Sequence, residues 1–424
     1  MGLFSSLSVE LITTGSELLI DRLNTHVVFL GQSLQTVGLT LSRHTTVGDG
    51  QDIEQVLKEA LERADIVLVT GGLGPTSDDL TRDYAAALLR RPLQHRLDIE
   101  ETIRTFFKER KLNPPQTVYR QAQVPEGARV LDNPHGTAPG LHLTTEKGGD
   151  LFLLPGPPRE LKPMWTDLVL PFLKSKVGDQ TPPFFHELKL SGIGESEVQE
   201  RAEHPLHSLA PGIEIAYCAA PRQVSLRLLH SDAALLERAL AFVRGEFGRS
   251  IYAENGETIE TVVVRMAIEK HVWLATAESC TGGLIAHRIT NIPGASQIFD
   301  RGWVTYTNEA KEAQLGVPSP LIATHGAVSG PVAESMARGV IERSPAHIAV
   351  STTGIAGPSG GSPGKPVGLV YLGLAFRGNQ KIHVRSIKKY LVPERETFKN
   401  MASHVALELI RRRLLNWKSK PQQT

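Results

Sequence analysis

Cysteine is scarce in this chain of 424 residues, which contains only Cys218 and Cys280. Two cysteines so far apart provide neither a disulfide framework nor a zinc site with several ligands at fixed spacing. This scarcity favours a reducing compartment, so we expect a cytoplasmic protein. No apolar run approaches the roughly 18 residues of a membrane span. The first residues, MGLFSSLSVELI, also lack the basic start and cleavage site of a secretory signal. We therefore expect no membrane association.

A surplus of charge of one sign is also missing. Lysine and arginine together number 46, against 45 aspartates and glutamates, which gives a formal net charge of +1. Non-specific nucleic-acid binding needs a cationic surplus that displaces counterions. The segment LSGIGESEV (190–198) has glycines two apart and lacks the GxxG loop of an RNA-binding KH domain. Both absences disfavour direct nucleic-acid binding.

The alternation of strand and helix patterns predicts an α/β fold. A length of 424 residues suggests about three domains. In residues 1–175, apolar runs at 9–13, 65–70 and 151–154 are strand candidates, and the last two run into glycine-rich loops. One helical stripe is formed by Leu23, Val27, Leu30, Leu34 and Val37. This pattern predicts a mainly parallel sheet, with ligands beyond the carboxyl ends of its strands.

Two further blocks follow a breaker-rich linker at 174–183. Residues 176–253 contain a strand, a helix, two alternating strands and a second helix, which predicts a compact α+β module. A hinge is expected at 249–260, with a turn at Asn255 and Gly256. Residues 254–424 return to an α/β pattern, with strands expected at 272–277, 347–354 and 367–376.

The motif AESCTGG (277–283) places polar side chains at a strand-to-helix turn. The amides of Thr281, Gly282 and Gly283 lie at the helix start, where they could hold an oxyanion that forms when Ser279 attacks a carbonyl. The serine needs a base, and a buried neutral Lys311 in YTNEAK could supply it.

Other interpretations of the same residues stay open. Ser279 or Thr281 could simply cap the helix, and Lys311 could be a solvated helix lysine. Cys280 is a rival nucleophile, although a buried cysteine usually acts as a small hydrophobe. The loop TTGIAGPSGGSPGKP (352–366) could cradle a phosphate or be an ordinary surface loop. It is no Walker A loop, because Pro366 stands where Ser or Thr is required.

A third constellation, TGGLGPTSDDLTRD (70–83), combines a glycine loop with the carboxylates of Asp78 and Asp79. Such carboxylates beside an amide-rich loop suit a divalent metal and a diphosphate. Alternatively, Thr76 and Asp79 form a helix capping box. Glu17 could add a carboxylate or cap the helix that follows it.

Several long motifs, in order along nearly the whole chain, resemble the CinA (competence/damage-inducible) family. They are TGGLGPTSDDLT, NPHGTAPG, LPGPPRE, SGIGESEV, AESCTGG, YTNEAK, HGAVSGPV and TGIAGPSGGS…KPVG. The resemblance implies that residues 1–175 form a molybdopterin-binding (MogA/MoeA-like) domain associated with ADP-ribose hydrolysis. It likewise implies a KH-type linker domain at 176–253 and a nicotinamide mononucleotide deamidase domain at 254–424. A homodimer that recycles pyridine nucleotides is the expected form.

For the deamidase domain, the resemblance implies that Ser279 is the nucleophile, Lys311 the general base, and Tyr306 and Asn308 helpers. No cofactor is expected there. Arg395 matches a basic position that would pair with the substrate phosphate. The other residues expected to contact the nucleotide are Thr281, Gly282, Gly283, Gly354, Ala356 and Gly357.

For the N-terminal domain, the resemblance implies a divalent metal of the Mg, Mn or Co type. Its expected ligands are Asp78, Asp79, Asp49 and Glu17, and the expected substrate loop contains Gly71, Gly72 and Gly74. Ser16 departs from the acidic form of the TTGSE motif that is usual in the family. Two alternatives stay open: the domain only binds a pterin or nucleotide, or the protein is a competence or DNA-damage factor that acts through partners.

Overall fold

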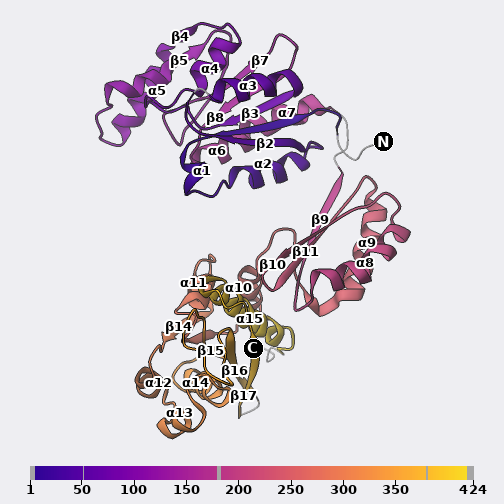
Figure 1. Ribbon diagram of the computed structural model, residues 1–424, viewed down its shortest axis with the longest axis vertical. Helices are drawn as coiled ribbons and strands as arrows, with labels where there is room; N and C mark the ends of the chain where they lie inside the picture. Colours follow the sequence, from indigo (N-terminus) through magenta and orange to yellow (C-terminus); the bar gives the residue numbers. More distant parts are fainter. Residues whose placement is uncertain (1–4, 51, 179–182, 379–380, 418–424) are drawn as a thin grey trace, which may run out of the picture. The chain divides into compact units, whose positions relative to one another are not determined.

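The computed structural model describes residues 5–50, 52–178, 183–378 and 381–417. These residues form two compact units (Figure 1). Unit 1 extends to Phe184 and includes residues 230–232, and unit 2 contains residues 185–229 and 233–424. Within the described ranges, no helix combines the length and the apolar character that crossing a membrane requires.

Unit 1 is built on a six-stranded sheet with the order β2-β1-β3-β8-β7-β6. β1 (Val9–Thr14), β2 (Leu41–Val47), β3 (Ile66–Thr70) and β8 (Asp150–Leu154) run parallel. β7 (Gly140–Thr144) and β6 (Arg129–Leu131) continue the sheet antiparallel. All residues of β3 and β8 are buried, as expected for central strands covered on both faces. The predicted mainly parallel α/β sheet is confirmed.

Helices cover both faces of this sheet. Successive residues of β1 point to opposite faces, so Leu11 and Ile12 belong to different core clusters. The α-helices of unit 1 are α1 (Glu17–Ile20), α2 (His26–Gln35), α3 (Asp52–Arg63), α4 (Thr81–Leu88), α5 (Leu97–Glu109), α6 (Pro158–Met164) and α7 (Leu170–Val177). Its other elements are the strands β4 (Leu93–His95) and β5 (Gln123–Pro125), a 3-10 helix (Gln116–Ala122) and a π-helix (Trp165–Val169).

The predicted helical stripe is wrong at its first residue. Leu23 lies before α2 and is 89% exposed, whereas Leu30, Leu34 and Val37 are buried. The Asn24 side chain accepts a hydrogen bond from the His26 amide (3.0 Å), which fixes the chain just before the helix begins. The segment 22–24 instead lines a cavity described below.

The first part of unit 2 is the predicted α+β module. Its sheet has the order β10-β11-β9-β12, and α8 and α9 contribute their apolar faces to one core. Its elements are β9 (Phe184–Ser191), α8 (Glu195–Leu209), β10 (Glu214–Ala220), β11 (Gln223–His230), α9 (Ala233–Phe247) and β12 (Ile251–Glu254). The expected hinge at 249–260 is wrong in part, because β12 pairs antiparallel with β9. The turn at Asn255 and Gly256 is confirmed, and both residues have positive φ.

The C-terminal part of unit 2 has a five-stranded sheet with the order β14-β13-β15-β16-β17. Its strands are β13 (Leu274–Glu278), β14 (Phe299–Val304), β15 (Ile348–Gly354), β16 (Leu369–Gly378) and β17 (Lys381–Tyr390). Its helices are α10 (Ile259–Glu269), α11 (Leu284–Thr290), α12 (Asn308–Leu315), α13 (Ser319–His325), α14 (Gly330–Glu342) and α15 (Arg395–Leu415). Leu274 and Ala275 again belong to different core clusters, so helices cover both faces.

Parallel pairing brings the two polar loops of this domain to one edge of the sheet. β13 and β15 are parallel neighbours, with Glu278 opposite Thr352. The loop that begins at Ser279 and the loop that follows Gly354 therefore leave the sheet side by side. This is the edge at which α/β sheets bind their ligands.

Candidate active site

Ser279 lies in a tight turn between β13 and α11. Its backbone amide donates to the carbonyl of Thr352 (3.0 Å), which ties the turn to β15. Gly282 and Gly283 have φ values of +62° and +93°, a region that side chains other than glycine rarely adopt. The two glycines let the chain reverse into α11 and leave the Ser279 side chain 9% exposed.

A buried carboxylate that sequence analysis missed organises this turn. Glu278 is fully buried and accepts hydrogen bonds from the amides of Ile285 (3.1 Å) and Ala286 (2.9 Å) at the start of α11. The N-cap of α11 is Gly283, without a side-chain cap. The alternative in which Ser279 or Thr281 caps the helix is therefore wrong. The sequence did contain a signal for this role of Glu278: an acidic residue that stands between a strand pattern and a glycine turn.

The turn leaves fewer backbone amides available than the trio expected as oxyanion donors. The Gly282 amide donates to the carbonyl of Ser279 (3.1 Å) and closes the turn. The amides of Thr281 and Gly283 have no acceptor within the described ranges, so they remain as donors. The Thr281 hydroxyl forms a hydrogen bond with the Thr352 hydroxyl (2.8 Å), which holds this part of the turn against β15.

Lys311 projects from α12 toward the serine. Its Nζ lies 3.3 Å from Ser279 Oγ, and the side chain is 1% exposed. The same Nζ donates to the backbone carbonyls of residues 305–307, most closely to that of Thr305 (2.9 Å). A solvated helix lysine is excluded by this burial, and the carbonyls fix the amine beside the hydroxyl.

Burial shifts the pKa of both groups beside Ser279. It lowers the pKa of Lys311, against smaller opposing effects of Cys280 and Glu309, because an ammonium loses hydration there. Burial also raises the pKa of the Cys280 thiol to about 12. A thiol in that state is a poor nucleophile, which removes Cys280 as the rival of Ser279.

Three of the other predicted residues form a second cluster of contacts. The Tyr306 hydroxyl accepts a hydrogen bond from Arg395 Nη2 (2.7 Å), and Arg395 Nη1 donates to the Gly357 carbonyl (3.2 Å). Tyr306 is 57% exposed, so this cluster borders solvent. Asn308 is the exposed first residue of α12. Its side chain has no hydrogen bond to the described residues.

The first residues of the predicted glycine-rich loop are constrained by packing against their neighbours. A side chain at Gly354 would approach the Leu369 carbonyl to 2.7 Å, and one at Gly357 would approach Val367 to 2.6 Å. Ala356 is buried in the apolar core. Of these three residues, only the backbone atoms are therefore available to a ligand.

Lys399 is a second residue that sequence analysis missed. It follows Arg395 by one turn of α15, and its Nζ lies 3.8 Å from the position that a Cβ of Gly282 would take. The start of α15 thus carries two cations toward this edge of the site. The sequence signal was the i, i+4 spacing of Arg395 and Lys399 in RETFK, which places both cations on one face of a helix. No local pattern links that face to a turn more than a hundred residues earlier in the chain.

Unit 1 contains a cavity of about 630 Å³ at the carboxyl ends of its parallel strands. Seven residues predicted for the N-terminal site line it: Glu17, Asp49, Gly71, Gly72, Gly74, Asp78 and Asp79. Gly71 must be glycine, because a Cβ there would lie 2.5 Å from the Thr14 carbonyl. The predicted loop and carboxylates therefore share one cavity.

Two of the predicted metal ligands already accept hydrogen bonds from backbone amides of the loops. Asp49 accepts a hydrogen bond from the Ser16 amide (2.9 Å), and Asp79 accepts one from the Thr76 amide (2.9 Å). Helix α4 begins only at Thr81, so Thr76 and Asp79 close a turn rather than cap the helix. Among the described residues, no three His, Cys, Asp or Glu side chains converge as metal ligands. A preformed metal site of three protein ligands does not fit this geometry.

Gln121 gives this cavity an unused hydrogen-bond acceptor. Its side chain is 3% exposed and lines the cavity, yet its Oε1 has no partner within the described residues. A buried carbonyl without a donor costs about 1–3 kcal/mol, so a ligand N–H or O–H would be favoured there. Gln121 lies far along the chain from the glycine loop, and no motif marks it.

Comparison with known proteins matches two separate regions of the chain to two family models. Residues 10–175 match the model described as probable molybdopterin binding domain, and residues 256–414 match the CinA C-terminal domain. A CinA-like protein of Akkermansia muciniphila is 43% identical over 94% of this chain and 95% of its own length. A crystal structure of the competence/damage inducible protein CihA from Agrobacterium tumefaciens is 43% identical, with a TM-score of 0.34. That match covers 36% of this chain and 94% of the other chain.

The matched regions define a class of α/β protein in which a probable molybdopterin binding domain precedes a CinA C-terminal domain. Identity of 43% over almost the full length of a relative settles the family. The chain belongs to the CinA family. The KH-type assignment of the module between the two domains stays a prediction.

Proposed function

We propose that the C-terminal domain hydrolyses the carboxamide of nicotinamide mononucleotide to give nicotinic acid mononucleotide and ammonia. The observation that carries this proposal is the buried Lys311 amine 3.3 Å from Ser279 Oγ. A serine hydroxyl beside an amine of lowered pKa is an activated nucleophile. The family resemblance supports the choice of substrate. We propose that the protein acts as a cytoplasmic homodimer.

The proposed reaction has two halves. In the first, neutral Lys311 takes the Ser279 proton while Oγ attacks the carboxamide carbon, and the Thr281 and Gly283 amides hold the oxyanion. The resulting ammonium of Lys311 then protonates the leaving nitrogen, which departs as ammonia. In the second half, Lys311 takes a proton from water, the hydroxide attacks the acyl ester, and Ser279 leaves with a proton returned by Lys311.

The charges around the site suit the two ends of this substrate. The pyridinium ring carries a fixed positive charge, which would further disfavour protonation of a nearby Lys311. At the other end, the phosphate requires cations, and Arg395 and Lys399 lie at the start of α15. Arg395 is held by Tyr306 and the Gly357 carbonyl, so its guanidinium is positioned before substrate binds.

The direct test is ammonia release from nicotinamide mononucleotide by the full chain and by Lys311→Ala. We expect the variant to lose at least about 10²–10³-fold in kcat, because a general base contributes on that order. Lys381→Ala, at an exposed position of β17, is the matched control and should keep full activity. Full activity in Lys311→Ala, or no ammonia release by the unmodified chain, would reject the proposal.

A second candidate function belongs to the cavity of unit 1. We propose that it binds ADP-ribose and cleaves its diphosphate with a divalent metal of the Mg, Mn or Co type. The glycine loop, the free Gln121 acceptor and the carboxylates of Glu17 and Asp78 support a nucleotide there. Because three protein ligands do not converge, substrate phosphates would have to complete the coordination of any metal.

Release of ribose 5-phosphate from ADP-ribose, measured with each metal, tests this second proposal. Asp78→Asn should lower turnover, while Asp98→Asn, an exposed aspartate of α5, should leave it unchanged. Binding of ADP-ribose without turnover under any metal would instead favour a non-catalytic nucleotide- or pterin-binding domain.

A further inference from the structure

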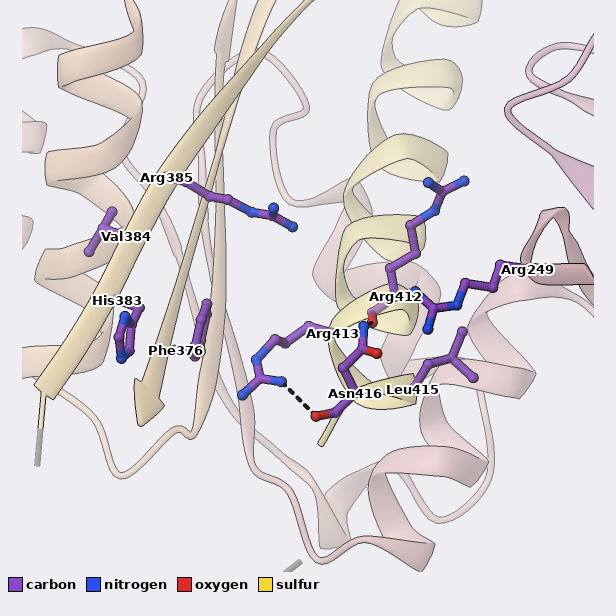
Figure 2. Close-up of a pocket in the computed structure, with 9 residues that line it drawn as sticks. All are labelled: Arg249, Phe376, His383, Val384, Arg385, Arg412, Arg413, Leu415 and Asn416. Carbon is purple, nitrogen blue, oxygen red and sulfur yellow. Dashed lines mark hydrogen bonds between the residues drawn. The ribbon is translucent and has the colours of Figure 1, made fainter. Parts of the chain in front are cut away.

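A second cavity of unit 2, of about 600 Å³, lies between the strand pair β16–β17 and the end of α15 (Figure 2). Four of its lining residues are arginines: Arg249, Arg385, Arg412 and Arg413. Among the residues that the structure describes, no aspartate or glutamate lines it, and none of its lining residues belongs to the Ser279 site. We call it the arginine pocket.

Most of this positive charge is not neutralised. Arg412 pairs with Glu408 (2.6 Å). The side chains of Arg249 and Arg385 have neither an acidic partner nor a hydrogen-bond acceptor within the described part of the chain. Arg413 donates only to the Asn416 carbonyl (3.1 Å), and its buried Nε has no acceptor among the described residues. Figure 2 shows Arg385 extending from β17 toward α15.

Aromatic rings hold the Arg413 guanidinium in place. Its central carbon lies 4.1 Å from the centre of the Phe376 ring and 4.8 Å from that of Trp417. The Phe376 ring is in turn stacked on His383, with centroids 5.0 Å apart. A guanidinium that packs against rings in this way keeps its N–H edge for an acceptor. Burial, together with the charge of Arg385, lowers the pKa of Arg413, so its charge lacks compensation.

The end of α15 explains only part of this arrangement. Basic residues in the last turn of a helix interact favourably with its free carbonyls. This accounts for Arg412 and Arg413. It does not account for Arg249, which follows α9, or for Arg385, which lies in β17. The segment after α9, strand β17 and helix α15 therefore each contribute arginines to one cavity.

We propose that the arginine pocket binds a small anion with adjacent phosphate groups, either inorganic polyphosphate or the triphosphate of a nucleotide. Several arginines from different elements can contact neighbouring phosphates through paired N–H groups. A volume of about 600 Å³ suits a ligand of nucleotide size. This site is separate from the Ser279 chemistry and does not depend on it.

The test is calorimetric titration of the full chain with sodium tripolyphosphate and, separately, with ATP at 0.15 M salt. We expect at least one probe to bind, and Arg385→Gln to weaken that binding by about tenfold or more. Arg385 lies exposed on an edge strand, so its replacement leaves the core intact. Arg338→Gln removes one exposed charge from α14 and is the matched control, which should bind as the unmodified chain does. Binding of tripolyphosphate identifies phosphate as sufficient, and binding of ATP alone adds a requirement for the nucleoside.

Several results would overturn the proposal. They are no binding of either probe, binding that Arg338→Gln weakens as much as Arg385→Gln, and binding that Arg395→Gln abolishes while Arg385→Gln retains it. The last result would place the anion at the Ser279 site instead. If Arg385→Gln changes only the oligomeric mass, and neither probe binds, the pocket is a contact between copies of this chain rather than an anion site.

Discussion

Lys311 is a residue at which the proposed chemistry and the stability of the fold conflict. Its burial lowers the pKa, so the unfolded chain binds more protons than the folded chain at pH values between the lowered pKa and about 10.5. Below that window, the folded state carries the full cost of a desolvated charge. The free energy of unfolding therefore rises with pH across the window.

Lys311→Met should consequently raise the free energy of unfolding at pH 7 while it abolishes ammonia release. Methionine fills similar volume without a charge, and the effect should disappear above pH 10.5, where the lysine is neutral in both states. Thermal unfolding at pH 7 and in alkaline buffer measures this difference. Lys381→Met, at an exposed site, should change neither property. A destabilised Lys311→Met at pH 7 would show that the three carbonyl contacts outweigh burial.

Glu278 should matter to stability as well as to the site. Glu278→Ala leaves the amides of Ile285 and Ala286 without their buried acceptor. We expect the free energy of unfolding to fall by about 3 kcal/mol, since hydrogen bonds to a charged group contribute about 1.5–3 kcal/mol. Glu278→Gln keeps one acceptor oxygen and should lose less. Denaturant unfolding of both variants measures this loss, with Glu342→Ala at an exposed position of α14 as the control. Equal stability of all three variants would contradict this role of Glu278.

The proximity of Ser279 and Lys311 could be predicted from the sequence, whereas most of the residues around them could not. Ser279 and Lys311 belong to compact motifs whose strand, turn and helix order is visible locally. The Gly282 amide and Glu278 form hydrogen bonds within the turn and with the start of α11, whereas Lys399 reaches the turn from a distant helix. Sequence separation hides such contacts because no local pattern records which turn a distant helix will meet.

At the scale of elements, α15 does more than the sequence suggested. It begins with Arg395 beside Tyr306 and ends at the arginine pocket. Midway, His404 Nε2 forms a hydrogen bond with Ser191 Oγ (3.2 Å). Further along, Arg411 donates to the carbonyl of Arg249 (2.6 Å). The helix thereby joins the α+β module to the C-terminal sheet through buried polar contacts.

His404 should make unit 2 sensitive to acid. Burial lowers the pKa of His404 to about 4, and the charged groups around it are Arg288, Glu408, Glu260 and Arg222. The unfolded chain therefore binds the proton first as pH falls from about 6.5 to 4. The free energy of unfolding should drop by up to about 3 kcal/mol over that range.

Urea unfolding at pH 7 and pH 4.5 measures this slope. His404→Gln should flatten it, because glutamine keeps a polar contact to Ser191 without titrating. His325→Gln, at the exposed end of α13, is the matched control and should keep the slope of the unmodified chain. An unchanged slope in His404→Gln would assign the acid sensitivity to other groups.

In the C-terminal sheet, the strands that the sequence did not predict are edge strands. β14 and β17 lie at the two edges of the C-terminal sheet, and their side chains are mostly exposed or half-buried. The buried strands β13, β15 and β16 have the apolar runs that local pattern recognises. β12 was mistaken for a hinge because its partner, β9, lies more than sixty residues earlier. The pairing of strands so far apart in sequence is decided by the assembly of the whole sheet, and no pattern within either segment indicates it.

At the scale of the whole molecule, the two candidate sites belong to separate units with separate apolar cores. The order of α/β, α+β and α/β blocks was visible in the sequence because each has its own strand and helix pattern. The grouping of residues 185–229 with the C-terminal residues was not visible. It depends on buried polar side chains of α15 such as His404 and Arg411, which have no apolar signature.

Separate cores predict separate activities. Ser279→Ala should lower ammonia release by at least about 10³-fold, since it removes the nucleophile, and should leave ADP-ribose cleavage within about twofold. Gly72→Val should have the reverse effect: Gly72 has a φ of +66°, and any Cβ there would collide with the Thr81 side chain in unit 1. Both assays on the same full-length preparations decide the matter. Equal loss of the two activities in either variant would mean that the two cavities serve one reaction, because neither substitution touches the core of the other unit.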